Sequence, residues 1–154
     1  WRILLPGGAL LAALLALGIW GWKKQRNQDL FGLGESGTWQ VEMWEPKSDQ
    51  WHALGAEEIQ VLVRQFSRTH DFQPLPTISC GTAMVNYGSP RYFVRLSAPT
   101  RTTLVFGVWA SGQRAYVWLG RPYGPGSRWV EFGGDSETIA AILKSAAERF
   151  KITR

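Results

Sequence analysis

The chain has 154 residues, of which 45% are hydrophobic and 19% are charged, and its formal net charge is +5. This composition is typical of a globular protein and excludes an intrinsically disordered chain. A single cysteine excludes an internal disulfide framework and a zinc site built from cysteines.

The N-terminal segment is strongly apolar. Residues 3–22 carry no charged side chain, and Lys23, Lys24 and Arg26 follow directly. Twenty helical residues rise about 30 Å, which matches the hydrocarbon thickness of a bilayer. Tryptophans stand at both ends of the segment, where the headgroup layers favour them. The sequence therefore predicts a transmembrane anchor over residues 1–24.

A cleaved signal peptide is the alternative interpretation of this segment. Ala16-Leu17-Gly18 offers small residues at the spacing that a signal peptidase accepts. The apolar run continues beyond that point to Trp22, which is longer than a signal peptide needs. We therefore expect the helix to be retained.

Small residues recur four apart in the predicted helix, at Gly8, Ala12 and Ala16. Such a strip lets a neighbouring helix approach closely, although an alanine-rich segment also produces the spacing by chance. We interpret the strip as a packing surface for other transmembrane helices. The positive residues that follow the segment favour the cytoplasmic side of a bacterial inner or organellar membrane for the rest of the chain, with the opposite orientation as the alternative.

A polar linker at residues 25–36 precedes a soluble domain at residues 37–154. Apolar residues at helical spacing predict helices at Ala56–Arg68 and Ser136–Phe150, the second capped by Asp135 or Ser136. Runs rich in branched and aromatic residues predict strands. These are Gly37–Trp44, Thr77–Asn86, Arg91–Ser97, Thr102–Ala110, Arg114–Gly120 and Arg128–Phe132.

The connections between the later strands are short and carry turn residues, as in Ser111-Gly112. Such links join antiparallel strands, because parallel pairing needs a long crossover. We therefore predict an α+β fold, with an antiparallel sheet of about four to six strands and two helices on one face.

One stretch of the domain is basic throughout. No acidic residue lies between Gln73 and Val130, whereas the same stretch contains six arginines, at positions 91, 95, 101, 114, 121 and 128. Strand alternation places the arginines and several aromatic rings on the sheet face opposite the aliphatic one. The members of this predicted partner-binding face are Arg91, Phe93, Arg95, Arg114, Tyr116 and Trp118, and the loop at residues 121–128 adds Arg121, Tyr123 and Arg128.

Arginines beside aromatic rings suit an acidic protein surface or anionic lipid headgroups near the membrane. Single-stranded nucleic acid uses the same pairing, but no nucleic-acid-binding or phosphate-loop motif is present. A further alternative is that the arginines form a solvated face over rings that cover the sheet. The loop at residues 121–128 is equally compatible with an ordinary hairpin connection.

Residues for catalysis are sparse. Cys80 with either His52 or His70 is a conceivable nucleophile pair, but a lone cysteine in a strand is more often a small buried apolar residue. Two histidines at unrelated spacing do not predict a metal site. The acidic pair Glu57-Glu58 suits the dipole at a helix N-terminus.

From these features we expect a non-catalytic, single-pass accessory or assembly subunit of a membrane-protein complex, without a cofactor. Its partners would be other membrane subunits and the bilayer. The alternative is a membrane-tethered enzyme or ligand-binding domain with a cleft near Cys80 and His70.

Overall fold

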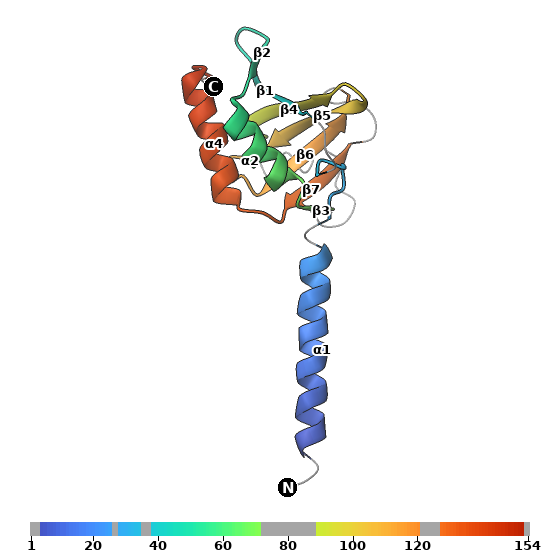
Figure 1. Cartoon of the computed structure of the whole chain (residues 1–154). Coiled ribbons are helices and arrows are strands. Elements are labelled where there is room, and N and C mark those ends of the chain that lie inside the picture. Colours follow the sequence, from blue (N-terminus) through green and yellow to red (C-terminus); the bar gives the residue numbers. More distant parts are fainter. Residues whose placement is uncertain (1–3, 26–27, 35–37, 72–88, 121–126, 153–154) are drawn as a thin grey trace.

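The computed structural model describes residues 4–25, 28–34, 38–71, 89–120 and 127–152 (Figure 1). The helices and strands in chain order are α1 (Leu4–Gln25), β1 (Gln40–Glu45), β2 (Gln50–Ala53), α2 (Ala56–Phe66), β3 (Thr69–Asp71), β4 (Tyr92–Ala98), β5 (Arg101–Val108), β6 (Arg114–Leu119), β7 (Arg128–Phe132) and α4 (Ser136–Arg149). The seven strands form one antiparallel sheet in the order β2-β1-β4-β5-β6-β7-β3. The predicted α+β class is confirmed, with more strands than expected.

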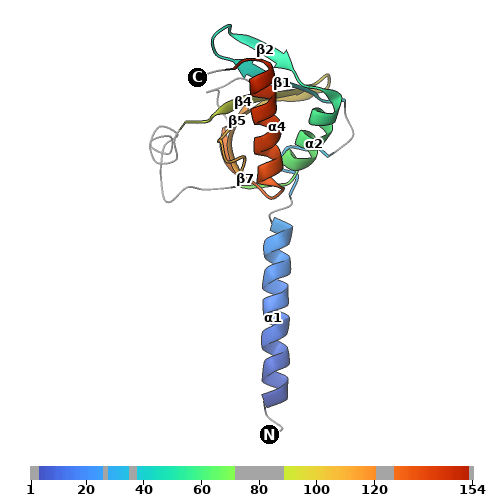
Figure 2. The same ribbon diagram turned by 90° about the vertical axis from the view of Figure 1, so that its left-hand side faces the viewer.

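Helices α2 and α4 cover one face of the sheet (Figure 2). The apolar stripe of α2 places Leu62 and Phe66 fully inside the core, where the Phe66 ring stacks on Phe106 and Phe132. Asp135 caps α4, because its carboxylate accepts hydrogen bonds from the two backbone amides of the first helical turn. Both predicted helices and the Asp135 cap are confirmed.

Two short strands at the sheet edges are absent from the sequence prediction. The residues between Glu45 and Gln50 form the turn of a β1–β2 hairpin, with Asp49 in the left-handed region at φ 54°. Strand β3 has only three residues, which are too few to show the alternation of apolar and polar side chains that identifies a strand. The strand predicted at Thr77–Asn86 lies outside the described residues.

The sheet face away from α2 and α4 carries a second apolar cluster. Phe93, Val105, Tyr116 and Trp118 form its buried centre. Four further tryptophans pack around it in partly buried positions, namely Trp44, Trp51, Trp109 and Trp129. The sheet is therefore packed on both faces, and the predicted division of side chains between faces is confirmed.

Gly107 of β5 leaves the space that the second cluster needs. It lies between Phe93 of β4 and Tyr116 of β6. A Cβ atom here would come within 2.9 Å of the Trp118 ring and 3.0 Å of Pro90, closer than the optimal carbon–carbon separation of about 3.5–4.0 Å. We expect Gly107→Ala to lower the free energy of unfolding by about 1–3 kcal/mol, measured by denaturant titration.

The matched control for this change is Gly18→Ala, because nothing lies within 4 Å of the added atom there. This control should leave the unfolding of the domain unchanged. A Gly107→Ala protein as stable as the parent chain would contradict the close packing of the second cluster.

Helix α1 extends away from the domain in both views (Figures 1 and 2). The predicted helical conformation of this segment is confirmed. Within the part of the chain that the structure describes, no helix combines the length and hydrophobicity needed to cross a membrane. The structure therefore does not support the transmembrane anchor predicted for residues 1–24.

Candidate functional site

The aromatic members of the predicted partner-binding face are buried. Phe93 and Tyr116 are each 7% exposed and Trp118 is 1% exposed. The Trp118 ring packs against both of the others, with centroid distances of 6.1 Å to Phe93 and 4.8 Å to Tyr116. The expectation that these rings form an open docking surface is therefore wrong. Sequence alternation assigned the correct face but could not show that the face is packed.

The arginine of β4 on this face is neutralised by an acidic residue of the adjacent strand. Arg95 lies directly opposite Glu42 of β1, and its Nη2 approaches the Glu42 carboxylate at 2.7 Å. The guanidinium also lies over the Trp51 ring, 4.4 Å from the ring centroid. An acid-free stretch of sequence therefore does not produce an unpaired positive surface at this position.

Glu131 of β7 also neutralises an arginine of an adjacent strand, near the other end of the sheet. It lies opposite both Arg114 of β6 and His70 of β3. Its carboxylate is 3.9 Å from Arg114 Nε and 3.0 Å from His70 Nε2, and it accepts a hydrogen bond from Gln113. Glu131 therefore joins three strands through polar contacts on one face.

Of the four remaining predicted contact residues, two lie among the described residues. Arg91 is exposed directly before β4. Arg128 is 49% exposed, with its Nη1 3.6 Å from the Asp71 carboxylate, a loose surface pair. Arg121 and Tyr123 lie outside the described residues, so the structure does not place that loop.

The histidines form carboxylate pairs in separate places. His70 contacts Glu131, whereas His52 contacts Glu45 at 2.8 Å and stacks on Phe150 with a centroid distance of 4.8 Å. Cys80 lies outside the described residues, so the structure does not place the predicted cleft of Cys80 and His70. Among the described residues no group of three metal-ligating side chains comes together.

Glu58 connects the N-terminus of α2 to the C-terminus of α4. Its carboxylate accepts two hydrogen bonds from Arg149, at 3.0 and 2.8 Å, and one from the Gly55 backbone amide at 2.8 Å. The Arg149 hydrogen bonds, followed by the Gly55 amide, lower the pKa of Glu58 below its ordinary value. This carboxylate has a structural role in the capping of α2.

We expect Glu58→Gln to lower the free energy of unfolding by about 1 kcal/mol at neutral pH. Because the pKa of Glu58 is lowered on folding, the stabilisation is present above the unfolded-state pKa and is lost as pH falls through the folded-state pKa. The difference between the variant and the parent chain should therefore shrink in acid, measured by denaturant unfolding across pH. Glu57→Gln, at an exposed neighbour, is the control and should change stability by only a few tenths of this amount.

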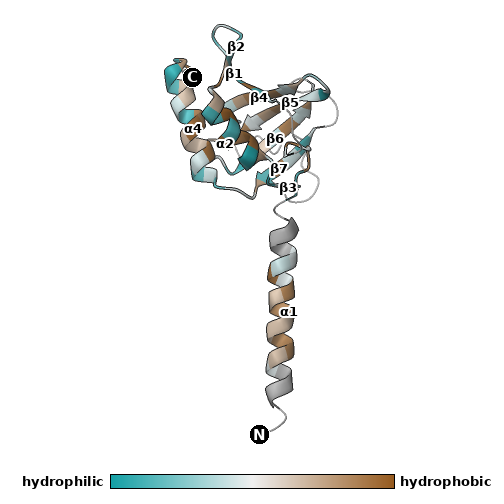
Figure 3. Ribbon diagram, viewed as in Figure 1, coloured by the Kyte–Doolittle hydropathy of each residue, from teal (hydrophilic) through white to brown (hydrophobic). Residues whose placement is uncertain are grey.

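The largest exposed apolar surface in the described residues lies on α1. Residues 8–21 contain apolar residues and glycine but no polar residue, and Figure 3 shows apolar colour in the middle part of the helix. The large side chains are between 56% and 65% exposed: Leu10, Leu11, Leu14, Leu15, Leu17, Ile19 and Trp20. The predicted packing residues Gly8, Ala12 and Ala16 are exposed on the same helix.

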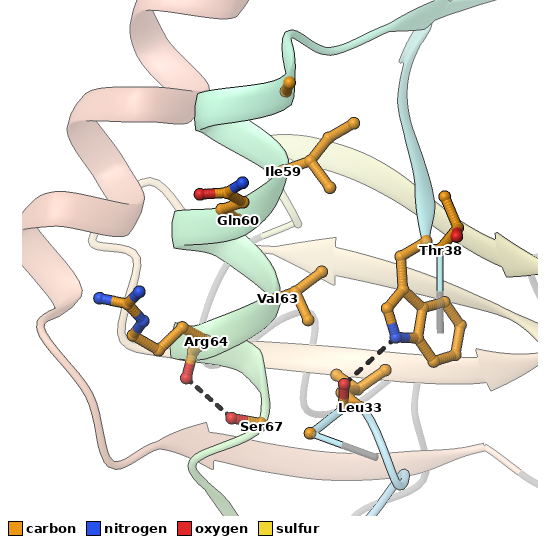
Figure 4. Close-up of a pocket in the computed structure, with 10 residues that line it drawn as sticks. Leu33, Thr38, Ile59, Gln60, Val63, Arg64 and Ser67 are labelled. Carbon is orange, nitrogen blue, oxygen red and sulfur yellow. Dashed lines mark hydrogen bonds between the residues drawn. The ribbon is translucent and has the colours of Figure 1, made fainter. Parts of the chain in front are cut away.

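A groove of about 660 Å³ separates α2 from the segment that leads into β1 (Figure 4). Ile59 and Val63 of α2 form one wall, and Leu33 lies across the groove from them. Trp39 also lines the groove, and its indole donates a hydrogen bond to the Leu33 carbonyl at 3.2 Å. No pattern in the sequence indicates this groove. Its two walls belong to separate segments, and the Ile59 and Val63 stripe was assigned wholly to the core.

Comparison of the chain with models of known protein families, with curated proteins and with solved structures finds no match.

Proposed function

We propose that the protein is a non-catalytic accessory or assembly subunit of a membrane-protein complex, with α1 as the element that holds it there. One observation carries this proposal: a helix whose described side chains are apolar and exposed on all sides. Water is a poor environment for such a surface, since exposed apolar patches of this extent mark sites of interaction. A helix that is apolar all round is buried in a large protein core or in lipid.

In this proposal, the positive residues beside α1 determine on which side of the membrane the domain lies. Lys23, Lys24 and Arg26 follow the apolar run and favour the cytoplasmic side of a bacterial inner or organellar membrane. The small residues Gly8, Ala12 and Ala16 would allow close approach of partner helices. On the domain, exposed Arg91 and Arg128 remain candidates for contact with an acidic partner surface or anionic headgroups.

Purification from membranes in mild detergent tests the proposal. We expect the full chain to elute with stoichiometric companion subunits, and we expect a variant with leucine at Gly8, Ala12 and Ala16 to lose them. The matched control places leucine at Ala9 and Ala13, which lie on another side of the helix. A full chain that elutes as a lone monomer would contradict the proposal.

A further inference from the structure

The segment that follows α1 is attached to an edge of the sheet. Two residues separate Gln25, the last residue of α1, from Gln28, so their Cα atoms lie within about 11 Å of each other. The Gln28 carbonyl accepts hydrogen bonds from the backbone amide of Thr69 at 3.0 Å and from its hydroxyl at 3.3 Å. Thr69 belongs to β3, the edge strand that Figure 1 shows at the end of the domain nearest α1.

Two apolar side chains of residues 28–34 pack on the domain. Leu33 is 2% exposed and belongs to the core cluster between the sheet and helices α2 and α4. The Phe31 ring meets the buried Phe106 ring of β5 edge-on, with a centroid distance of 5.5 Å. These contacts stabilise the packed position of the segment, because its release would return both side chains to water.

Polar contacts hold the backbone of the same segment. Arg101 of β5 donates a hydrogen bond from Nη1 to the Gly32 carbonyl at 2.9 Å, and the Trp39 indole donates one to the Leu33 carbonyl at 3.2 Å. Within the segment, the Asp29 carboxylate accepts hydrogen bonds from two backbone amides further along the chain. Residues 28–34 therefore form a compact turn that several parts of the domain hold in place.

We propose that residues 28–34 act as a strap that ties the domain to the end of α1. While the strap is packed, β3 stays close to α1, so a partner that fixes α1 also fixes the position of the domain. A released strap would allow the chain between Gln25 and Thr38 to extend to about 45 Å. The proposal goes beyond the role of α1 in a membrane and does not depend on it, because the contacts that carry it join the strap to the domain.

Release of the strap is separable from unfolding of the domain. Among residues 28–34, Leu33 alone is buried, whereas the strands and helices of the domain share a continuous core. Segments with few buried side chains open at a lower free-energy cost than the core of the same protein. A change confined to the strap should therefore alter the distance between α1 and the domain and leave the domain folded.

Distances between two nitroxide labels, measured by pulsed electron paramagnetic resonance, test the proposal on the full chain in detergent. The labels are at Ile19→Cys and Arg68→Cys, both exposed positions, with Cys80 replaced by serine and excess unlabelled chain added to suppress distances between molecules. While Gln28 pairs with Thr69, the path of the chain keeps the two labelled Cα atoms within about 30 Å. We expect a distribution confined to short distances. A parent distribution that extends far beyond this range would overturn the proposal by itself.

A carboxylate at position 33 should release the strap. Leu33→Asp is unfavourable in the packed position, because an unpaired carboxylate is costly to bury in an apolar core. The distance distribution should become broader and longer, with thermal unfolding as the check that the domain is folded. Leu119→Asp is the matched control, since it makes the same change at a leucine of β6 that is 44% exposed, and it should keep the parent distribution. A folded Leu33→Asp protein with the parent distribution would overturn the proposal.

Phe31→Ala tests the strap by a milder change, should Leu33→Asp fail to fold. The readout is hydrogen exchange of the Thr69 amide, which the Gln28 carbonyl protects. Exchange should become about ten-fold faster, as expected for loss of a partly buried ring that packs on Phe106. Leu119→Ala is the control and should leave this exchange rate unchanged. Equal exchange of the Thr69 amide in Phe31→Ala and in the parent chain would overturn the proposal.

Discussion

If α1 holds the protein at a membrane as proposed, glutamates in place of Leu14 and Leu15 are expected to release it. Both leucines are exposed, at 58% and 59%, and both lie in the middle of the apolar run. A charged side chain at the centre of a lipid-embedded helix costs about 2.5–3.5 kcal/mol on insertion scales, so two such changes outweigh the apolar gain of several neighbouring residues. The measurement is the fraction of the chain that sediments with membranes after an alkaline wash.

The control for this experiment is Leu119→Glu, which places a glutamate at a leucine of the domain that is 44% exposed. That variant should sediment like the parent chain, because Leu119 lies on β6 and not on α1. Equal sedimentation of the α1 variant and the Leu119 variant would show that α1 does not hold the protein at the membrane.

Truncation of Trp118 will have the largest effect on the stability of the domain. Its side chain is 1% exposed and packs between Phe93, Tyr116 and the backbone space left by Gly107. We expect Trp118→Ala to lower the free energy of unfolding by about 3–5 kcal/mol, because the lost contacts leave a cavity that the sheet cannot close. The measurement is the midpoint of denaturant unfolding, followed by circular dichroism.

The stability of Trp118→Ala distinguishes a structural role of the indole ring from a role in partner docking. A residue whose role is partner docking would weaken binding and leave the stability of the isolated chain nearly unchanged. Trp20→Ala, at a tryptophan of α1 that is 63% exposed, is the control and should not change the unfolding midpoint of the domain. A Trp118→Ala domain as stable as the parent chain would contradict the structural role assigned to this ring.

Local patterns in the sequence predicted the helices and most of the sheet. The spacing of Leu62 and Phe66 specified the buried stripe of α2, and Asp135 specified the start of α4. Alternation along β4 and β6 also sorted their side chains correctly between the two faces. These features depend on residues close together in the chain.

Local sequence patterns did not predict contacts between segments that lie far apart in the chain. Arg95 and Glu42 are 53 positions apart, and only the register of β4 against β1 brings them together. Glu131 lies one residue beyond the acid-free stretch and neutralises part of its charge. Sequence periodicity does not specify strand pairing, so it could not show that Arg95 and Arg114 lie beside acidic residues of adjacent strands.

The measurement that tests the central claim most directly is the environment of α1 in native membranes. A nitroxide at Leu14→Cys, in a chain with Cys80 replaced by serine, reports its accessibility to oxygen and to a water-soluble nickel complex by electron paramagnetic resonance. We predict that nickel is excluded from this position, because lipid or partner helices surround it. Nickel accessibility equal to that of a label at exposed Arg91 would place α1 in water and contradict the account.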